Sequence, residues 1–279
     1  MSYKSLNIKG VLTTLDEPLV MGILNVTPDS FYEGSRKQTE KEIHERIQAI
    51  LSEGGAIVDV GGYSSRPDAV EVSEEEEMNR VAIALKILCE HYPQVAVSVD
   101  TFRSEVARRC VEEFGAAIIN DISGGGLDNK MFDTVAELQV PYIMMHMRGT
   151  PQTMQRHTDY GNMIEEIMCF FAEKVRQLHQ REVNDVIIDL GFGFSKTLDQ
   201  NYLLMSRLKD FSLFELPMLV GISRKSMIYK LLGNTPQECL TGTTVLNTIA
   251  LLNGADILRV HDVRAAKEAI RIVSEYTKY

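Results

Sequence analysis

The chain has 279 residues, enough to bury a large core in one large α/β domain or in two small ones. Its composition is ordinary for a globular enzyme, and its net charge of -10 argues against nucleic acid as the main partner, because phosphate backbones select basic surfaces. No apolar run reaches about 18 residues and the first ten residues have no apolar signal core, so we expect no membrane span and no secretory signal.

The first elements along the chain define a unit that later elements repeat. Residues 3–18 alternate apolar and polar side chains, which predicts a short β-hairpin before the main fold. Leu19–Asn25 is an apolar run without charge, typical of a strand buried on both faces. Asn25 ends this run, Thr27–Ser30 has the composition of a loop, and Thr39–Ser52 is predicted to be a helix. The unit is a buried strand, a polar residue at its carboxyl end, a polar loop and a helix.

The rest of the chain repeats this unit. Seven more strands are predicted, at Ala56–Gly61, Val95–Asp100, Ala116–Ile122, Pro141–Met145, Asp185–Leu190, Met218–Ser223 and Asp256–Val260. Further helices are predicted at Ser73–Tyr92, Ser104–Phe114, Asp128–Gln139, Tyr160–Arg181, Leu198–Leu208, Pro236–Asn253 and Val263–Lys278. This alternation predicts a (β/α)8 TIM barrel, residues 19–279, with residues 1–18 as an N-terminal hairpin extension of a single domain. A doubly wound open sheet is the alternative, but no G-x-G-x-x-G motif follows the first strand.

One charge run and two long connections interrupt the regular pattern. A capping box predicts a helix start at Ser73, and we interpret Glu74–Glu77 as a solvated first turn that suits the helix dipole. The connections Gly62–Ser73 and His146–Tyr160 are longer than average and rich in Ser, Arg, Pro, Gly and Thr. Loops of this length in a compact barrel are usually functional.

The cysteine pattern indicates a reducing compartment. Four cysteines are scattered along the chain without a C-x-x-C motif, at Cys89, Cys110, Cys169 and Cys239. This usage is typical of reduced thiols in a cytoplasmic protein and argues against a disulfide framework or a zinc site.

Each predicted strand ends in a polar or glycine-rich group. In chain order these groups are Asn25, Gly61–Pro67, Asp100, Asn120 with Asp121, His146, Asp189, Ser223–Lys225, and Arg259 with His261. A lone aspartate after a strand is often a helix cap, so each group has a structural explanation when taken alone. Eight such groups in succession are hard to obtain by chance, and the carboxyl ends of barrel strands face the active site.

The basic members of this set predict an anionic substrate. Arg66, Lys225, Arg259 and His261 are cationic or can become so. Arginine offers a planar fork for phosphate and lysine a compact charge. Four such groups at one end of the barrel indicate that the substrate carries a phosphate or pyrophosphate. The alternative for any one of them is an ion pair with Asp100 or Asp189.

The acidic and amide members predict a heterocycle. Asp100 and Asp189 can each accept two parallel hydrogen bonds, and Asn120 both donates and accepts. Such groups suit a 2-amino-4-oxo ring. Met145 is either a wall of that site or core filler. Phe194, in a glycine-containing run after the sixth strand, offers a flat face.

Two runs resemble the signatures of a known family. Met21–Phe31 closely resembles the first signature of the dihydropteroate synthases, and Asp59–Pro67 resembles the second. Blocks similar to the later ones of the family follow in order at Ser98–Thr101, Asn120–Gly124, Met145–His146, Asp189–Phe194, Ser223–Lys225 and Arg259–His261. The resemblance covers nearly the whole chain after the hairpin.

The resemblance implies a (β/α)8 barrel and a transferase of folate biosynthesis. The family joins 6-hydroxymethyl-7,8-dihydropterin pyrophosphate to p-aminobenzoate, giving 7,8-dihydropteroate and pyrophosphate. Members use Mg²⁺, usually work as homodimers, and bind sulfonamides as mimics of p-aminobenzoate. Expulsion of pyrophosphate is the difficult step in this reaction, so we expect electrostatic stabilisation of the leaving group and no covalent enzyme intermediate.

Site roles carry over position by position. The resemblance implies that Asn25 touches the Mg²⁺ and that Arg66, Arg259 and His261 hold the pyrophosphate. It implies that Asp100, Asn120, Asp189 and Lys225 bind the pterin, with Met145 and Ser65 also at the substrates, and that Phe194, Lys225 and Ser226 line the p-aminobenzoate site. The segments Thr27–Lys37 and Tyr63–Val70 are expected to close over both substrates. The catalytic set is thus Arg66, Asp100, Asp189, Lys225, Arg259 and His261.

The sequence departs from the common family pattern at several positions. Tyr63, Ser65, Asp68, Leu190 and Ser195 replace residues that are usual there, which affects loop details and sulfonamide affinity more than the reaction. Three other functions remain possible on these residues: a methyltetrahydrofolate methyltransferase, an aldolase or isomerase with Lys225 as an amine catalyst, and a non-catalytic pterin-binding paralogue. The retained pyrophosphate-binding residues favour the synthase.

Overall fold

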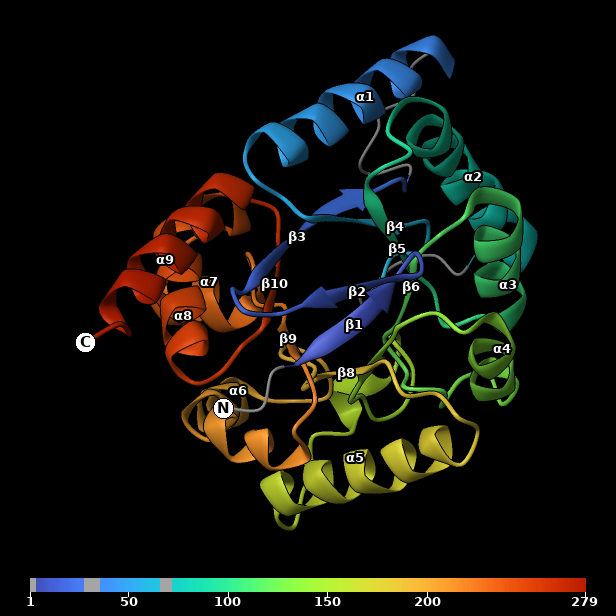
Figure 1. Cartoon of the computed structure of the whole chain (residues 1–279). Helices are drawn as coiled ribbons and strands as arrows, with labels where there is room; N and C mark the ends of the chain where they lie inside the picture. The colour runs from blue at the N-terminus through green and yellow to red at the C-terminus, as the bar shows by residue number, and fades with distance from the viewer. Residues whose placement is uncertain (1–3, 28–35, 66–71) are drawn as a thin grey trace.

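The computed structural model describes residues 4–27, 36–65 and 72–279, and its centre is a closed barrel of eight parallel strands (Figure 1). These strands are β3 (Leu19–Asn25), β4 (Ile57–Gly61), β5 (Ala96–Asp100), β6 (Ile118–Asp121), β7 (Tyr142–Met145), β8 (Val186–Asp189), β9 (Met218–Val220) and β10 (Ile257–Val260). Each pairs with its neighbour in sequence, and β10 pairs with β3 to close the barrel. The predicted (β/α)8 fold is confirmed.

A ring of helices covers the outside of the barrel (Figure 1). The helices are α1 (Arg36–Ser52), α2 (Glu74–His91), α3 (Ser104–Phe114), α4 (Met131–Leu138), α5 (Met163–His179), α6 (Leu198–Ser206), α7 (Ser226–Leu232), α8 (Leu240–Leu252) and α9 (Val263–Tyr276). Two of the helical elements, α7 and the 3-10 helix Leu208–Phe214, were not predicted from the sequence. The helix expected over Pro236–Asn253 is instead a 3-10 turn, Pro236–Glu238, followed by α8, because the Thr235 capping box and Pro236 start a separate short turn.

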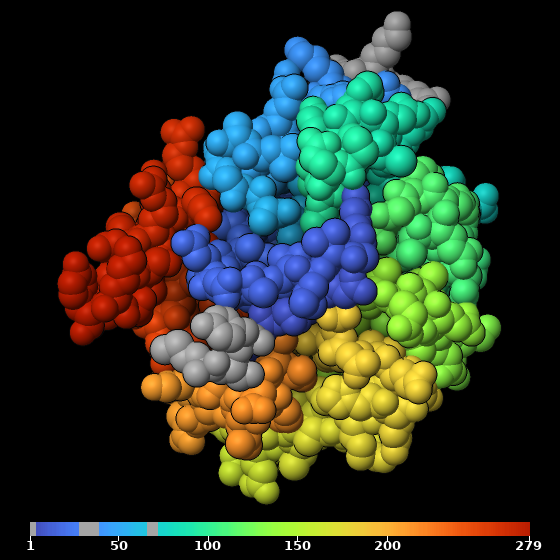
Figure 2. All heavy atoms as spheres, viewed as in Figure 1, coloured from blue at the N-terminus to red at the C-terminus, as the bar shows by residue number. Residues whose placement is uncertain are grey.

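The predicted N-terminal hairpin is present and seals one end of the barrel. Its strands β1 (Ser5–Ile8) and β2 (Val11–Thr14) are joined by Lys9 and Gly10, whose φ angles of 52° and 76° make a two-residue turn that matches strand twist. Leu6 is fully buried against side chains from the barrel interior. In Figure 2 the hairpin fills the centre of this face. The boundary predicted between residues 18 and 19 stays a prediction.

Polar contacts fix the hairpin to the starts of three strands. The Lys4 ammonium lies 2.8 Å from the Asp256 carboxylate, and the Asn7 amide donates to Asp185 at 3.0 Å. The Lys9 ammonium donates to the carbonyl of Val95 at 2.8 Å. Since these partners precede β10, β8 and β5, the hairpin ties together strands that are far apart in sequence.

The barrel interior changes from apolar to charged along its axis. Next to Leu6 lies an apolar layer that includes Met21, Ile57, Ile143 and Leu219. Asp59, Asn120 and Arg259 come after it toward the carboxyl ends of the strands. At the open end, a third group packs together: Ile122, Met145, Met147, Met154 and Phe194. The apolar layer therefore supports the fold, while the polar layer is placed at the end where chemistry occurs in such barrels.

The expectation of a solvated Glu74–Glu77 turn is wrong for Glu77. Ser73 caps α2 by accepting a hydrogen bond from the Glu76 amide at 3.1 Å, and Glu74 to Glu76 are exposed. Glu77 is 0 % exposed and pairs with Arg103. A helix turns by about 100° per residue, so four consecutive side chains cannot share one face. Glu77 falls on the same side as Met78 and Val81 and faces the core.

The four cysteines, all within the described ranges, form no disulfide: Cys89 and Cys169 are exposed, and Cys110 and Cys239 are buried. Among the helices of residues 4–27, 36–65 and 72–279, none is long and apolar enough to cross a membrane.

Candidate active site

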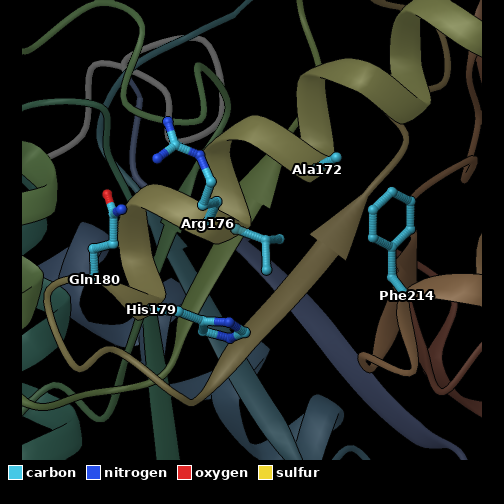
Figure 3. A pocket seen from close by; sticks show the side chains of 6 residues that line it. Ala172, Arg176, His179, Gln180 and Phe214 are labelled. Atoms are coloured by element: carbon cyan, nitrogen blue, oxygen red, sulfur yellow. The ribbon is translucent and has the colours of Figure 1, made fainter.

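The carboxyl ends of the barrel strands bring most of the predicted site residues together, at the end opposite the hairpin. Asn25, Asp100, Met145 and Asp189 end four of the strands, and Arg259 lies on β10. A groove of about 540 Å³ lies elsewhere, between α5 and Phe214 (Figure 3), and contains none of these residues. The strand ends, and not this outer groove, form the candidate site.

A partly buried arginine joins two carboxylates at the centre of the site. The Arg259 Nε donates to Asp59 at 2.7 Å, and its second terminal nitrogen donates to Asp100 at 2.6 Å. Burial acts to lower the pKa of Arg259, but the two carboxylates more than offset it and raise that pKa. Arg259 therefore forms the ion pair that was the alternative to phosphate binding. Its other terminal nitrogen, Nη1, has no hydrogen-bond partner among the described residues.

Asp59 is a site residue that sequence reasoning missed. It is fully buried and accepts hydrogen bonds from the Asn120 amide, at 3.2 and 3.4 Å, as well as from Arg259. The sequence did offer a signal for this role: Asp59 is an acidic residue within an otherwise apolar strand, β4, and a buried charge requires a partner. Asp59 therefore orients both the guanidinium and the carboxamide.

The two predicted ring-binding carboxylates have raised pKa values. Burial raises the pKa of Asp100, Arg259 opposes this, and the nearby Asp59 adds to the increase. Burial likewise raises the pKa of Asp189, while Lys225 and the Gly191 amide, which donates at 2.8 Å, oppose it. Three carboxylates thus face two cations, Arg259 and Lys225. The site has acceptor capacity to spare for a ligand that brings N–H donors.

Lys225 connects the carboxylates to an apolar wall. Its ammonium donates to the Phe192 carbonyl at 2.6 Å and lies 4.7 Å from the centre of the Phe194 ring. Burial lowers the pKa of Lys225 to about 8, although Asp189 opposes the shift. The amine remains mostly charged at neutral pH. Met145, left open as wall or filler, packs with Phe194 and therefore belongs to this wall.

Ser223 fixes the ring orientation of His261. The Ser223 hydroxyl accepts from the His261 amide at 3.1 Å and lies 3.0 Å from His261 Nδ1. In the tautomer in which Ser223 donates its own proton to Nδ1, the ring proton is on Nε2. Burial and the charges of Arg259 and Arg224 lower the pKa of His261 to about 4. Arg46 holds the same segment by donating to the His261 carbonyl at 2.8 Å.

Asn25 is the predicted metal-binding residue, and its surroundings suit a hard cation. Its side chain is exposed, and its Oδ1 lies 3.4 Å from the point that a Cβ on Gly61 would occupy. An Asp100 carboxylate oxygen lies 3.8 Å from the same point. The Asn25 carboxamide oxygen is of the type that Mg²⁺ prefers, whereas this Asp100 oxygen already accepts from Arg259 at 2.6 Å. No cluster of three His, Cys, Asp or Glu side chains suited to a metal occurs in the described ranges.

The remaining predicted residues lie at the edge of the site or outside the residues that the structure describes. Arg66 and Asp68 lie outside the described residues, as do positions 28–35 of the first expected loop and 66–70 of the second. Ser65 is half-buried, and Ser226 is the first residue of α7. The Tyr63 hydroxyl accepts from Gln152 at 2.6 Å, which joins the connection after β4 to the one after β7.

Known proteins are similar to this chain over most of its length. The family model for pterin binding enzymes matches residues 21–261. The chain is 41% identical over 267 residues to the dihydropteroate synthase of Escherichia coli K12, covering 95% of this chain and 94% of that protein. The Yersinia pestis dihydropteroate synthase, solved with a sulfonamide drug, superimposes with a TM-score of 0.90 at 38% identity, over 99% of this chain and 100% of that one.

A second solved structure has a substrate-sized molecule bound. The Xanthomonas albilineans dihydropteroate synthase, solved with 4-aminobenzoic acid, superimposes with a TM-score of 0.91 at 33% identity and covers 100% of both chains. Family model, sequence and structure all span the barrel and its strand ends. The chain belongs to the pterin binding enzyme family and, within it, to the dihydropteroate synthases, transferases of folate synthesis.

Proposed function

We propose that this chain condenses 6-hydroxymethyl-7,8-dihydropterin pyrophosphate with p-aminobenzoate to give 7,8-dihydropteroate and pyrophosphate. The observation that carries the proposal is the position of Arg259. Its guanidinium is held by Asp59 and Asp100 beside Asn120 and thus lies between a heterocycle-binding layer and the open end. One residue therefore borders both halves of a pterin pyrophosphate.

The pterin half is assigned to residues held on the strands. Asp100, Asn120 and Asp189 offer two carboxylates and one carboxamide, which complement the ring N–H groups and the carbonyl of a 2-amino-4-oxo heterocycle. As the ring develops positive charge at its exocyclic carbon, the two carboxylates stabilise it. Their raised pKa values support this, because an incoming cationic ring relieves the excess of buried negative charge.

The pyrophosphate half is assigned to Arg259 and His261, together with Arg66 from the undescribed segment. The remaining terminal nitrogen of Arg259 and the Nε2–H of neutral His261 are donors for the negative charge that develops on the leaving group. His261 needs no protonation for this role. A neutral donor also avoids adding a third cation beside Arg259 and Arg224.

The p-aminobenzoate half is assigned to Phe194, Lys225 and Ser226. The Lys225 ammonium above the Phe194 ring gives an apolar face next to a positive charge, which suits an aromatic carboxylate. An aromatic amine is already a competent nucleophile near neutral pH, so no general base is required. The reaction then proceeds by departure of pyrophosphate and attack on the exocyclic carbon, with no covalent enzyme intermediate.

We assign the Mg²⁺ to Asn25. The carboxamide oxygen above Gly61 supplies one ligand, and a metal bound there would neutralise pyrophosphate charge. The protein's part is to hold the diphosphate next to Asn25 through Arg259 and His261.

A coupling assay tests the proposed reaction. The purified chain is mixed with dihydropterin pyrophosphate, labelled p-aminobenzoate and Mg²⁺, and labelled dihydropteroate is measured. We expect product that falls to background when the metal is removed by EDTA and returns when Mg²⁺ is added back. Absence of product with the pterin pyrophosphate still bound in calorimetry would support a non-catalytic pterin-binding protein. Absence of both would reject the substrate assignment.

A second copy of the chain is proposed to cover the outer faces of α7, α8 and α9. Large apolar side chains are exposed there in the described structure: Leu231, Leu232, Leu240, Val245, Ile249, Leu252, Ile272 and Tyr276. The three helices are consecutive and lie together on one side of the barrel (Figure 1). Exposed apolar side chains gathered on neighbouring helices are typical of an interface, and a homodimer buries the same surface on both partners. We place this dimer in the cytoplasm, which the four unpaired cysteines support.

Substitution at the centre of this face is expected to separate the dimer. Val245, 53 % exposed on α8, is changed to glutamate, which would bury a charge on each side of the interface. Sedimentation velocity should show a dimer for the unchanged protein and a monomer for Val245→Glu. The matched control is Leu213→Glu, since Leu213 is 78 % exposed in the 3-10 helix Leu208–Phe214, outside these three helices. A dimeric Val245→Glu protein would place the interface elsewhere.

A further inference from the structure

A buried amine closes the loop that follows β8. The Lys196 ammonium donates to the carbonyls of Gly191 and Phe194, at 3.0 and 3.1 Å, and lies 3.1 Å from Nδ1 of His146. Its residue is 3 % exposed. An ammonium has three N–H donors, and here each one meets an acceptor. Two of those acceptors belong to the loop itself, and the third follows β7.

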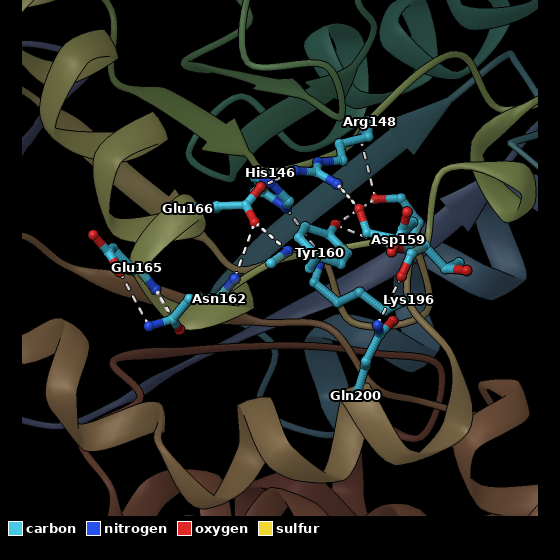
Figure 4. A network of polar contacts seen from close by, with 12 residues as sticks. His146, Arg148, Asp159, Tyr160, Asn162, Glu165, Glu166, Lys196 and Gln200 are labelled. Atoms are coloured by element: carbon cyan, nitrogen blue, oxygen red, sulfur yellow. Dashed lines mark hydrogen bonds and ion pairs between the residues drawn. The ribbon is translucent and has the colours of Figure 1, made fainter.

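The neighbouring Ser195 connects the same two loops a second time. Its φ of 47° lies in the left-handed region, which costs energy for a residue with a side chain and turns the chain sharply before Lys196. The Ser195 hydroxyl accepts from the Arg148 amide at 3.1 Å, and the Ser195 carbonyl accepts from Tyr160 at 3.1 Å. Figure 4 shows this network between the two loops.

The backbone is built for this close approach. Gly191 has a φ of 69°, and a Cβ at this position would lie 2.0 Å from the His146 carbonyl oxygen. Only glycine allows the two loops to lie so close. Lys196 and His146 then remain in contact when the amine loses its proton, because a neutral amine can accept from Nδ1–H and still donate to both carbonyls. Burial lowers the pKa of Lys196 to about 7, so both forms occur near neutral pH.

The loop after β8 carries part of the proposed p-aminobenzoate site but none of the proposed pterin-binding residues. Phe194 lies within the loop, and the Phe192 carbonyl is the acceptor that holds Lys225. Asp100, Asn120 and Asp189 instead lie on β5, β6 and β8, whose positions are set by the hydrogen bonds between strands. Movement of the Phe194 part of the loop would therefore displace this wall while leaving the strand backbones in place. The one direct link is at the start of the loop, where the Gly191 amide donates to Asp189 at 2.8 Å.

We propose that Lys196 and Ser195 form a brace that positions Phe194 and Lys225 for p-aminobenzoate. Both are positioning residues, since neither is assigned a contact with substrate. The inference rests on the proposed function, because it assigns a support to that function's second substrate site. Its expected effect is selective: loss of the brace should weaken binding of p-aminobenzoate and have little effect on binding of the pterin pyrophosphate.

The test compares two variants with the unchanged protein in the coupling assay. Lys196→Met keeps the stem of the side chain and removes all three donors, so two buried carbonyls lose their partner. We expect KM for p-aminobenzoate to rise by about ten- to thirtyfold. The dissociation constant of the pterin pyrophosphate in calorimetry should change by less than about twofold. Ser195→Ala removes the contacts of the hydroxyl with the Arg148 amide and, at 3.3 Å, with the Tyr160 hydroxyl, and should raise the same KM by about threefold.

Controls separate this brace from general loss of structure. Lys86→Met removes an exposed lysine on α2 and should change neither constant. Thermal unfolding is measured for each protein, and if Lys196→Met does not fold, Ser195→Ala decides the question by the same selectivity. Equal weakening of both substrates, or an unchanged KM for p-aminobenzoate in the folded variants, would overturn the proposal. No dihydropteroate from the unchanged protein would instead reject the proposed function itself.

Discussion

Replacing Arg259 with methionine is expected to lower the rate of dihydropteroate formation by about a thousandfold. The guanidinium is assigned to the charge that develops on pyrophosphate, and loss of one such donor typically costs about 10²- to 10³-fold in rate. The substitution also leaves Asp59 and Asp100 without their shared cation. An uncompensated buried charge costs about 3–5 kcal/mol, and proton uptake by Asp100 would reduce this cost.

The measurement is kcat from single-turnover kinetics, together with the free energy of unfolding in urea. Arg271→Met serves as the control, because Arg271 is an exposed arginine in the second half of α9 and is not assigned to the site. Near-normal kcat in a folded Arg259→Met protein would remove Arg259 from the reaction and restrict it to a structural ion pair with Asp59.

Replacing Asp189 with asparagine is expected to weaken binding of the pterin pyrophosphate by about a hundredfold. The change puts an N–H₂ group where a ring N–H donor requires an acceptor, and hydrogen bonds to a charged group are worth about 1.5–3 kcal/mol. The fold should persist, since the oxygen of the new carboxamide can still accept from the Gly191 amide. Burial already raises the pKa of Asp189, so the neutral replacement relieves a desolvation cost.

Calorimetry with the pterin pyrophosphate measures this affinity, and thermal unfolding measures the fold. Asp199→Asn is the matched control, because Asp199 is exposed in the first turn of α6. If Asp189→Asn binds as tightly as the unchanged protein, the ring-binding carboxylate has been assigned to the wrong strand.

The barrel fold and the family could both be predicted from the sequence, because each depends on local sequence patterns. A buried strand followed by a polar residue and a helix is a unit of roughly 30 residues, and its repetition predicts the closed barrel. Asn25, Asp100, Asp189 and Arg259 were located correctly at strand ends. Their assigned roles stay predictions until substrates are bound.

The partners of these residues could not be predicted, because they depend on distant segments. Asp59 and Arg259 are 200 positions apart and meet only when β10 closes on β3. The burial of Lys196 was not predicted, since its partner His146 is 50 positions away. Glu77 looked like one member of a solvated run, and only the rotation of α2 shows that it faces the core.

The sealed end of the barrel determines the route of every small molecule. Because Leu6 and its neighbours close one end, two substrates and two products of the proposed reaction must share a single opening. In the proposed reaction the pterin binds deepest, so we expect it to arrive before p-aminobenzoate covers it. We expect dihydropteroate and pyrophosphate to leave by the same path. The packed apolar layer, which the hairpin covers, thereby limits the enzyme to one direction of approach.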